Sequence, residues 1–236
     1  MIRVDLVAMS ERRAIVRSGL ADQIYESLVD RVLELSDAPG ERLVIDQIAR
    51  ELGVSPTPVR DALTRMAGEG FIESTPFRGF TLLPVPSLAE IAQSFEARAV
   101  IEVAAIRLGC ERRTQQQLGE LRDLQVRIAS RLPAARARTY APFGRLNRRF
   151  HLLLVSTSGN RYLEGALRSL EHDALMARTM HGRGVPDLSN IVDEHQAILD
   201  AVEARDPDRA ATAAARHIAD GRERVLALRR ARDEER

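Results

Sequence analysis

Residues 54–68 read VSPTPVRDALTRMAG, and this stretch decides the fold of the first part of the chain. Its apolar residues recur at helical spacing, so a short helix here can bury one side and leave a narrow polar side exposed. The side predicted to be buried contains Val59, Ala62, Leu63 and Met66, and the side predicted to be exposed contains Thr57, Arg60, Asp61 and Thr64. A slim polar helix can enter a major groove and its N-terminus attracts phosphate, so the stretch predicts a helix that reads DNA.

The start of this helix is marked by Ser55 and Thr57, whose hydroxyls can cap it and which are each followed by a proline. The sequence leaves the capping residue open, with Thr57 slightly favoured because proline crowds the residue before it. Either cap places the Thr57 hydroxyl and the Arg60 guanidinium at the helix N-terminus.

The flanking sequence predicts a winged helix-turn-helix. The expected elements are helices at 20–35 and 46–52, a stop at Gly53, and strands at 71–74 and 80–82 around a turn at 75–79.

Several separated motifs resemble the GntR family of bacterial transcription regulators. They are Pro39-Gly40-Glu41-Arg42-Leu43, the run from Val54 to Leu63, and Pro76, Arg78, Gly79 and Phe80 in the wing. The resemblance covers residues 20–84 and is specific because these motifs recur in order. The residues expected to contact DNA are Ser55, Thr57, Arg60 and Thr64 on the helix, with Arg78 and Gly79 in the wing. Many members have an arginine where Pro56 stands, so one expected base contact is absent or supplied elsewhere.

At 236 residues, 44% of them hydrophobic and only 4% aromatic, the chain can form two modest, mainly helical domains. Its 35 basic residues, all arginine, balance 34 acidic ones, and residues 1–84 hold 10 arginines against 13 acidic residues. Charge therefore gives no support to DNA binding, and a winged helix that docks another protein is the alternative. The motifs favour DNA.

The lone cysteine, Cys110, lies in an apolar helical run and is expected to be a buried hydrophobe rather than a reactive thiol. Residues 1–18 carry charges throughout, and no run approaches the roughly 18 apolar residues of a membrane span. We therefore expect a soluble, cytoplasmic protein.

The predicted domains are a loose arm at 1–18, the winged helix-turn-helix at 19–83, a linker at 84–87 and a helical domain at 88–230. Pro84 and Pro86 favour an extended linker, and Ser87 with Glu90 forms a capping box that starts the next helix. The helices expected after it are 88–110, 114–132 closed by Pro133, 140–155, 162–180, 189–204 and 207–228, with a frayed charged tail. The fold class is therefore mainly α, with a small β-hairpin wing and a C-terminal antiparallel helical bundle.

Three histidines lie on the inward sides of three different bundle helices: His151, His195 and His217. Any one of them alone is best explained as a hydrogen-bonded core residue. Together they could hold a divalent cation, with the carbonyl oxygen of Asn147, one turn before His151, as a fourth ligand. Spacing alone leaves the core and the metal site equally open.

A second resemblance bears on these histidines. Phe150-His151, Glu194-His195 with Ile198, and Arg216-His217-Ile218, together with Arg98 and Glu102, look like the effector-binding domain of the FadR branch of the GntR family. Many members of that branch bind a metal through one aspartate and three histidines, and small carboxylates dock on or beside it. The aspartate position is Asn147 here, which brings no negative charge, so the cation binds more weakly or the pocket works without one. Zinc or nickel would suit the imidazoles.

Arginines are the expected carboxylate ligands because a planar guanidinium matches that group at two points. Arg98 is the first choice, although pairing with Glu102 one turn on is an equal alternative. Arg148 and Arg178 are weaker candidates, and His172 and His181 are expected at the surface or behind the site.

The sequence therefore predicts a homodimeric, ligand-responsive transcription regulator, a repressor rather than an enzyme, that binds operator DNA and a small organic acid. One alternative is a metal sensor. Another is a metal hydrolase fused to a DNA-binding module, which lacks an evident general base because Glu194, next to His195 in sequence, points elsewhere on its helix.

Overall fold

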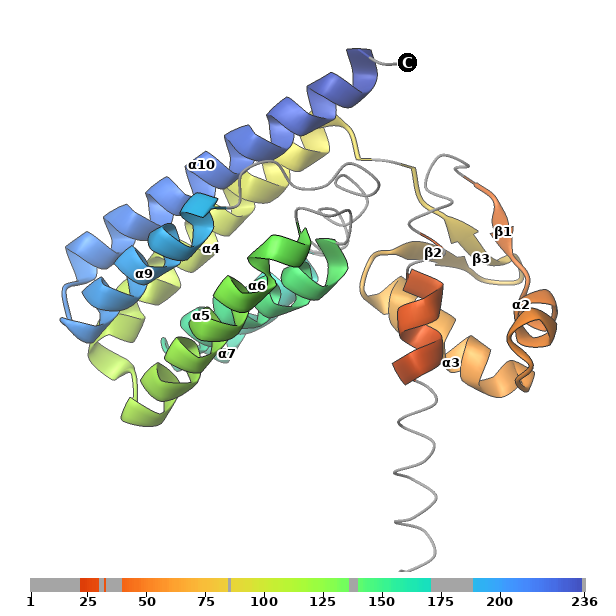
Figure 1. The fold of residues 1–236 in the computed structure, drawn as a ribbon, viewed down its shortest axis with the longest axis horizontal. Coiled ribbons are helices and arrows are strands. Elements are labelled where there is room, and N and C mark those ends of the chain that lie inside the picture. Colours follow the sequence, from red (N-terminus) through yellow and green to blue (C-terminus); the bar gives the residue numbers. More distant parts are fainter. Residues whose placement is uncertain are drawn as a thin grey trace, which may run out of the picture. The chain divides into compact units, whose positions relative to one another are not determined.

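The computed structural model divides into two compact units, Met1–Val85 and Pro86–Arg236 (Figure 1). The residues that it describes are 22–29, 32, 40–84, 86–135, 140–170 and 189–234. The predicted arm at 1–18 lies outside them, as do Arg178, His172 and His181.

The first unit combines helices with a small antiparallel sheet. After helical residues 22–29, its elements are β1 (Arg42–Leu43), α2 (Ile45–Leu52), α3 (Pro56–Gly68), β2 (Ile72–Thr75) and β3 (Gly79–Leu82). The strands lie in the order β1-β3-β2, so β3 is central and the β2–β3 hairpin forms the wing. The short strand β1, in which Arg42 pairs with Thr81, was not predicted, because two residues carry no detectable alternation.

Helix α3 has the two sides that the sequence predicts. Val59, Ala62, Leu63 and Met66 are buried, and Thr57, Arg60, Asp61 and Thr64 are exposed. Gly53 ends α2 with a left-handed φ of 66° and so makes the tight turn before α3. The far end of α3 is tied to the first helical segment, where Arg65 pairs with Asp22 at 3.1 Å.

The preference for Thr57 as the cap of α3 is wrong. The N-cap is Ser55, with Pro56 as the first helical residue, and the Ser55 side chain makes no capping hydrogen bond. Ser55 has the extended backbone that a residue before proline prefers, and Thr57 is helical although Pro58 follows it. Pro58, at the third helical position, has no N–H for the Ser55 hydroxyl to accept from, which removes one of the two usual partners of a cap. Prolines are tolerated in this turn because its N–H groups have no partner within the helix.

The second unit is all helical in the residues described. Its helices are α4 (Leu88–Arg112), α5 (Gln115–Ala135), α6 (Tyr140–Ser156), α7 (Arg161–Ser169), α9 (Ser189–Glu203) and α10 (Pro207–Glu234). The long helices α4 and α10 run side by side and antiparallel (Figure 1), with Arg107 of α4 paired to Asp208 at the start of α10. The predicted capping box of Ser87 and Glu90 starts α4.

Three predicted helix ends are wrong. Helix α5 continues past Pro133 to Ala135, since proline's fixed φ suits a helix and removes only one hydrogen bond near its end. Helix α7 ends at Ser169 rather than near 180. Helix α10 runs to Glu234 instead of fraying, because Arg229 pairs with Asp233 one turn on and also donates to the Pro86 carbonyl at 2.8 Å.

The interior of the helical unit is a continuous apolar core that includes Phe95, Ile106, Leu121, Phe150 and Ile198. Cys110 is fully buried within it, as predicted. None of the helices described is long and apolar enough to cross a membrane.

Candidate functional site

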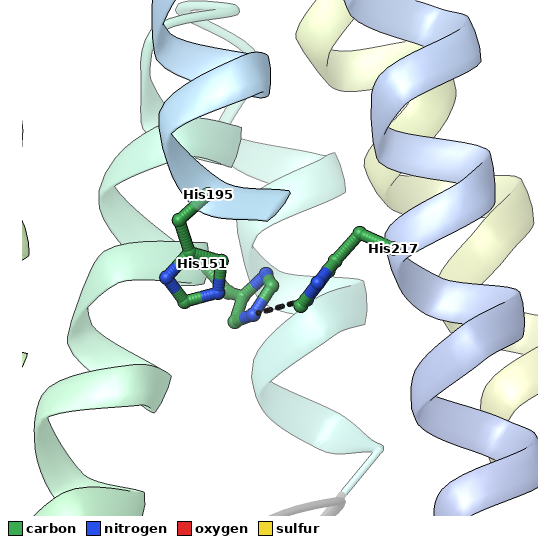
Figure 2. A group of neighbouring side chains, drawn as sticks. All are labelled: His151, His195 and His217. Atoms are coloured by element: carbon green, nitrogen blue, oxygen red, sulfur yellow. Dashed lines mark hydrogen bonds between the residues drawn. The ribbon is translucent and has the colours of Figure 1, made fainter. Parts of the chain in front are cut away.

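Three imidazoles meet inside the helical unit. His151 comes from α6, His195 from α9 and His217 from α10, and Figure 2 shows their rings turned toward one another. Their exposed fractions are 4%, 0% and 6%. One nitrogen from each ring can be chosen so that all three lie within 4.8 Å of one another. Separate helices therefore bring the three predicted histidines to one buried point.

Each of two imidazoles is held from behind by a carboxylate and an arginine. The His151 Nδ1 lies 2.7 Å from Glu102 Oε2, and the other oxygen of Glu102 accepts from Arg98 Nε at 2.6 Å. Both Arg98 and Glu102 belong to α4, one turn apart, and both are buried. We refer to Arg98, Glu102 and His151 as the α4–α6 relay.

The second carboxylate performs the same task from α9 and α10. Glu194 Oε2 lies 2.7 Å from His217 Nδ1. Arg224, two turns beyond His217 on α10, donates to both oxygens of Glu194 at 2.7 and 2.8 Å. We refer to Arg224, Glu194 and His217 as the α9–α10 relay.

His195 has no such support. Neither of its ring nitrogens has a hydrogen-bond partner among the residues described, and the ring stacks on Phe150 with centroids 4.1 Å apart. The side-chain oxygen of Asn147 is likewise buried and has no partner in the part of the chain that the structure describes. Buried polar atoms in proteins are normally paired, so three orphaned acceptors or donors on two residues call for a ligand at this point.

Burial and the neighbouring charges set the protonation of the cluster. Burial would raise the pKa of the Glu102 carboxyl, but Arg98 and His151 outweigh it and hold that pKa well below its usual range. Burial likewise opposes ionisation of Glu194, yet its hydrogen bonds to His217 and Arg224 lower its pKa to about 2. Both carboxylates are therefore charged at neutral pH and can only accept hydrogen bonds.

The imidazoles shift the other way. Burial lowers the pKa of His217 to about 4 and that of His195 well below its ordinary value, and it lowers the pKa of His151 against the opposing pull of Glu102. Three neutral imidazoles are the form in which histidine binds metals.

The residues present fit a bound cation. With both Nδ1 atoms donating to carboxylates, His151 Nε2 and His217 Nε2 are bare acceptors, yet they lie only 3.3 Å apart. Two nitrogens that are each about 2.05 Å from one tetrahedral ion lie roughly 3.3 Å apart, so the spacing is that of a shared cation. A hydrogen bond between them would require a proton that neither neutral ring can supply.

The residues expected to bind an effector are more enclosed than the sequence suggests. Arg98 is buried and paired with Glu102, which was the equal alternative, and Arg148 is half-buried. Both line a cavity of about 20 Å³ that also touches Asn147 and His151. That volume holds about one water molecule and no organic acid.

Sequence reasoning missed the roles of Glu102, Glu194 and Arg224 in this centre. The spacing of Glu102 from Arg98 indicated an ion pair but not a histidine partner. Glu194 does point away from His195, as the helix geometry requires, but it points to His217, which is 23 residues further along the chain. Only the packing of α9 on α10 could reveal that.

The predicted DNA-contacting residues are displayed on the first unit. Ser55, Thr57, Arg60 and Thr64 of α3 are exposed, as are Arg78 and Gly79 in the wing. The Thr64 hydroxyl donates to the Arg60 carbonyl at 2.8 Å, and Arg42 of β1 braces the wing by donating to the Arg78 carbonyl at 2.6 Å.

Family models match both units. The family described as bacterial regulatory proteins, gntR family, matches residues 20–82, and the FCD domain matches residues 93–220. The chain belongs to the GntR family. It is therefore a bacterial DNA-binding transcription regulator of the FCD branch, whose helical unit is the effector-binding domain.

Named relatives of this GntR regulator agree. The Nta operon transcriptional regulator of Aminobacter aminovorans is 35% identical over 144 residues, which are 59% of this chain and 64% of that protein. The HTH-type transcriptional repressor RspR of Escherichia coli (strain K12) is 25% identical over 207 residues, covering 88% of this chain and 89% of that one. The solved structure of E. coli McbR/YncC has the same fold, with a TM-score of 0.63, 24% identity, and coverage of 86% and 94%.

These comparisons decide one alternative. The families and the relatives are transcription regulators and not enzymes, so the metal hydrolase interpretation is set aside. Glu194, the carboxylate next to His195 that was considered as a general base, is hydrogen-bonded to His217 and Arg224 instead.

Proposed function

We propose that this GntR regulator is a cytoplasmic, homodimeric repressor whose helical domain binds a divalent cation and a small carboxylate effector. The observation that carries the proposal is the buried meeting point of His151, His195 and His217, where His195 and Asn147 have polar atoms without partners among the residues described. The name of the relative RspR, a repressor, supports repression.

The cation would be held by the three histidines, with Asn147 as a fourth ligand. Zinc and nickel suit imidazole nitrogens, and the neutral amide of Asn147 leaves the full charge of the ion available. When bound, the cation supplies a positive charge that attracts an effector carboxylate.

The carboxylate would approach beside Arg148 and Arg98. Because the cavity there has a volume of about 20 Å³, an organic acid can enter only if the surrounding side chains and helices move apart. An effector that approaches beside Arg98 and Arg148 would therefore have to change the conformation of the domain, whereas a pocket of about 780 Å³ already touches His217 and Glu194.

Helix α10 connects the centre to the linker. It carries His217 and, three turns further on, Arg229, which donates to the Pro86 carbonyl at 2.8 Å. A displacement of α10 would therefore move the start of α4 and the linker before it. In a homodimer such a movement changes the spacing of two DNA-binding units and hence their affinity for a pseudo-palindromic operator.

On DNA, α3 would lie in the major groove with Ser55, Thr57, Arg60 and Thr64 at phosphates or base edges. Arg78 and Gly79 would reach from the wing toward the minor groove. The local arginines and the α3 N-terminus supply the attraction that the acidic first unit does not provide overall.

The test uses the full chain and a duplex that it selects from a random library. Protein dialysed against a chelator is titrated with Zn²⁺, then with a panel of small organic acids, and operator affinity is measured at fixed salt. We expect Zn²⁺ to raise the melting temperature, acids to bind only after Zn²⁺, and a bound acid to weaken operator binding. An unchanged melting temperature with Zn²⁺ or Ni²⁺ would remove the metal from the proposal.

The tight cavity also favours a second candidate, a metal sensor in which the cation itself is the signal. A bare ion fits the histidine centre without any opening of the domain. In that case Zn²⁺ alone would change operator affinity, and organic acids would add nothing.

A further inference from the structure

We propose that Glu102, held by Arg98, is a positioning residue that fixes the His151 tautomer and so decides whether the histidine centre can bind a cation. The inference rests on the proposed metal site for its consequence, but the tautomer can be measured without any metal. It assigns to the α4–α6 relay a role that the α9–α10 relay, with the same residue types, does not fully share.

The first step concerns the proton on the His151 ring. An ionised carboxylate can only accept, so Glu102 Oε2, 2.7 Å from His151 Nδ1, requires the proton on Nδ1. A neutral ring protonated there has its lone pair on Nε2, which faces the corresponding atom of His217 at 3.3 Å. The relay therefore turns a metal-binding lone pair toward the centre.

The second step concerns Arg98, which never accepts a hydrogen bond. In the α4–α6 relay the two oxygens of Glu102 have separate tasks: Oε1 accepts from Arg98 Nε and Oε2 accepts from His151 Nδ1. An amide in place of this carboxylate has one oxygen for two donors. If the oxygen faces Arg98, the NH₂ group faces His151 and donates to Nδ1. That moves the ring proton to Nε2, where it blocks the cation.

In the α9–α10 relay the same replacement costs one bond to arginine but need not change the contact with histidine. Glu194 Oε2 by itself accepts from both His217 Nδ1, at 2.7 Å, and Arg224 Nη2, at 2.8 Å. A glutamine oxygen in that position keeps both of these bonds. The NH₂ group in place of Oε1 loses the bond from Arg224 Nη1 and faces that donor, but the partly exposed Arg224 side chain can turn Nη1 toward solvent without disturbing His217. His217 can therefore keep its proton on Nδ1.

The two relays supply a matched pair of variants, Glu102→Gln and Glu194→Gln. The full chain is labelled with ¹⁵N-histidine, and the ring nitrogens are read by NMR in chelator at neutral pH, with His151 and His217 assigned from variants. We expect the proton of His151 to move to Nε2 in E102Q, and that of His217 to stay on Nδ1 in E194Q. Zn²⁺ affinity, measured against a chromophoric chelator, should fall roughly 10- to 100-fold in E102Q and less than about tenfold in E194Q.

A double variant separates positioning from structural damage. With Arg98→Met added to E102Q, no donor competes for the amide oxygen, so the oxygen turns to His151 and the Nδ1–H tautomer returns. Zn²⁺ affinity should then recover most of the loss. If E102Q merely disturbed packing, the second core substitution would instead lower the Zn²⁺ affinity further. Melting in chelator reports the fold of each variant.

The proposal is overturned if His151 keeps its proton on Nδ1 in E102Q, if E102Q and E194Q lose equal Zn²⁺ affinity, or if the double variant recovers nothing. If E102Q does not fold, the wild-type spectrum decides, because a proton on His151 Nε2 in the wild type contradicts the relay. If the wild type binds neither Zn²⁺ nor Ni²⁺, the proposed metal function fails, while the tautomer measurement still tests the relay.

Discussion

Helix α3 and the histidine centre handle polar side chains in opposite ways. The residues of α3 that are expected to contact DNA are exposed, and Arg60 and Thr57 face solvent. The histidines are buried, and two of them are held by carboxylates that arginines hold in turn. One region displays its functional groups to a partner that arrives from outside, whereas the other encloses them.

The two regions differ in their effect on the stability of the folded state. An exposed arginine keeps its hydration until DNA binds, so its replacement should change affinity and leave stability alone. A buried imidazole without partners destabilises the fold until a ligand satisfies it. Replacing the imidazole without partners should therefore raise stability while it lowers ligand affinity, whereas replacing a carboxylate-bonded imidazole should lower both.

The largest effect is expected at His195. Replacing His195 with leucine removes two buried ring nitrogens that have no partner among the residues described, while keeping an apolar side chain beside Phe150. We expect the metal-free protein to become more stable by about 1–3 kcal/mol in urea unfolding. Zn²⁺ affinity should fall by more than roughly 100-fold, because one of three imidazole ligands is lost.

A matched control is His151→Leu, which removes an imidazole whose Nδ1 is bonded to Glu102. This variant should lose stability as well as Zn²⁺ affinity, since it leaves a buried carboxylate with one partner fewer. If H195L destabilises the metal-free protein as much as H151L does, then His195 is a hydrogen-bonded core residue. The two histidines would then not differ in their contribution to stability.

The next effect is a dependence of stability on pH. His217 has a pKa of about 4 in the folded protein against an ordinary value of 6.5, so between these values the unfolded chain binds protons that the folded chain does not. The free energy of unfolding should therefore fall as the pH drops from 6.5 toward 4, by about 3 kcal/mol for this residue. Urea unfolding in chelator across this range measures the slope.

The carboxylates contribute only at lower pH. Glu194 has a pKa of about 2 in the fold against 4.5, so its stabilisation is complete above 4.5 and is lost as the pH falls toward 2. A slope between pH 6.5 and 5 thus belongs to the histidines, and His217→Gln should reduce it. A flat profile there would mean that the imidazoles are not enclosed as described.

On the exposed side of α3, Arg60→Ala should weaken operator binding by roughly 1–3 kcal/mol, about tenfold or more, without changing the melting temperature. Arg60 is exposed, so its removal leaves no cavity. Arg127→Ala, an exposed arginine on α5 of the other unit, has the same change in charge and should retain full affinity at the same salt. Equal losses in the two variants would mean that Arg60 acts only through net charge.

Features that depend on residues close together in the sequence could be predicted, and features that depend on distant residues could not. The two sides of α3 and the Ser87–Glu90 capping box follow from residues within one or two turns, and both were predicted correctly. The inward placement of His151 and its partners also followed from helical spacing. Their supporting carboxylates did not, because the pairing of Glu194 with His217 depends on how α9 packs against α10. The strand β1 depends likewise on β3, 37 or more residues later.

The smallest effect is expected at the tip of the wing, where an exposed residue lowers the stability of the folded state. Phe77 is fully exposed and has a left-handed φ of 63°, which costs an L-residue about 1–2 kcal/mol, whereas asparagine adopts it readily. Phe77→Asn should raise the free energy of unfolding by about 0.5–1 kcal/mol, and Phe77→Ala, which keeps a strained backbone, should not. Both remove an apolar ring beside Arg78 that can enter a minor groove, so both should weaken operator binding by the same few-fold factor. If Phe77→Asn stabilises the protein and keeps full affinity for the operator, the Phe77 ring does not contribute to DNA binding.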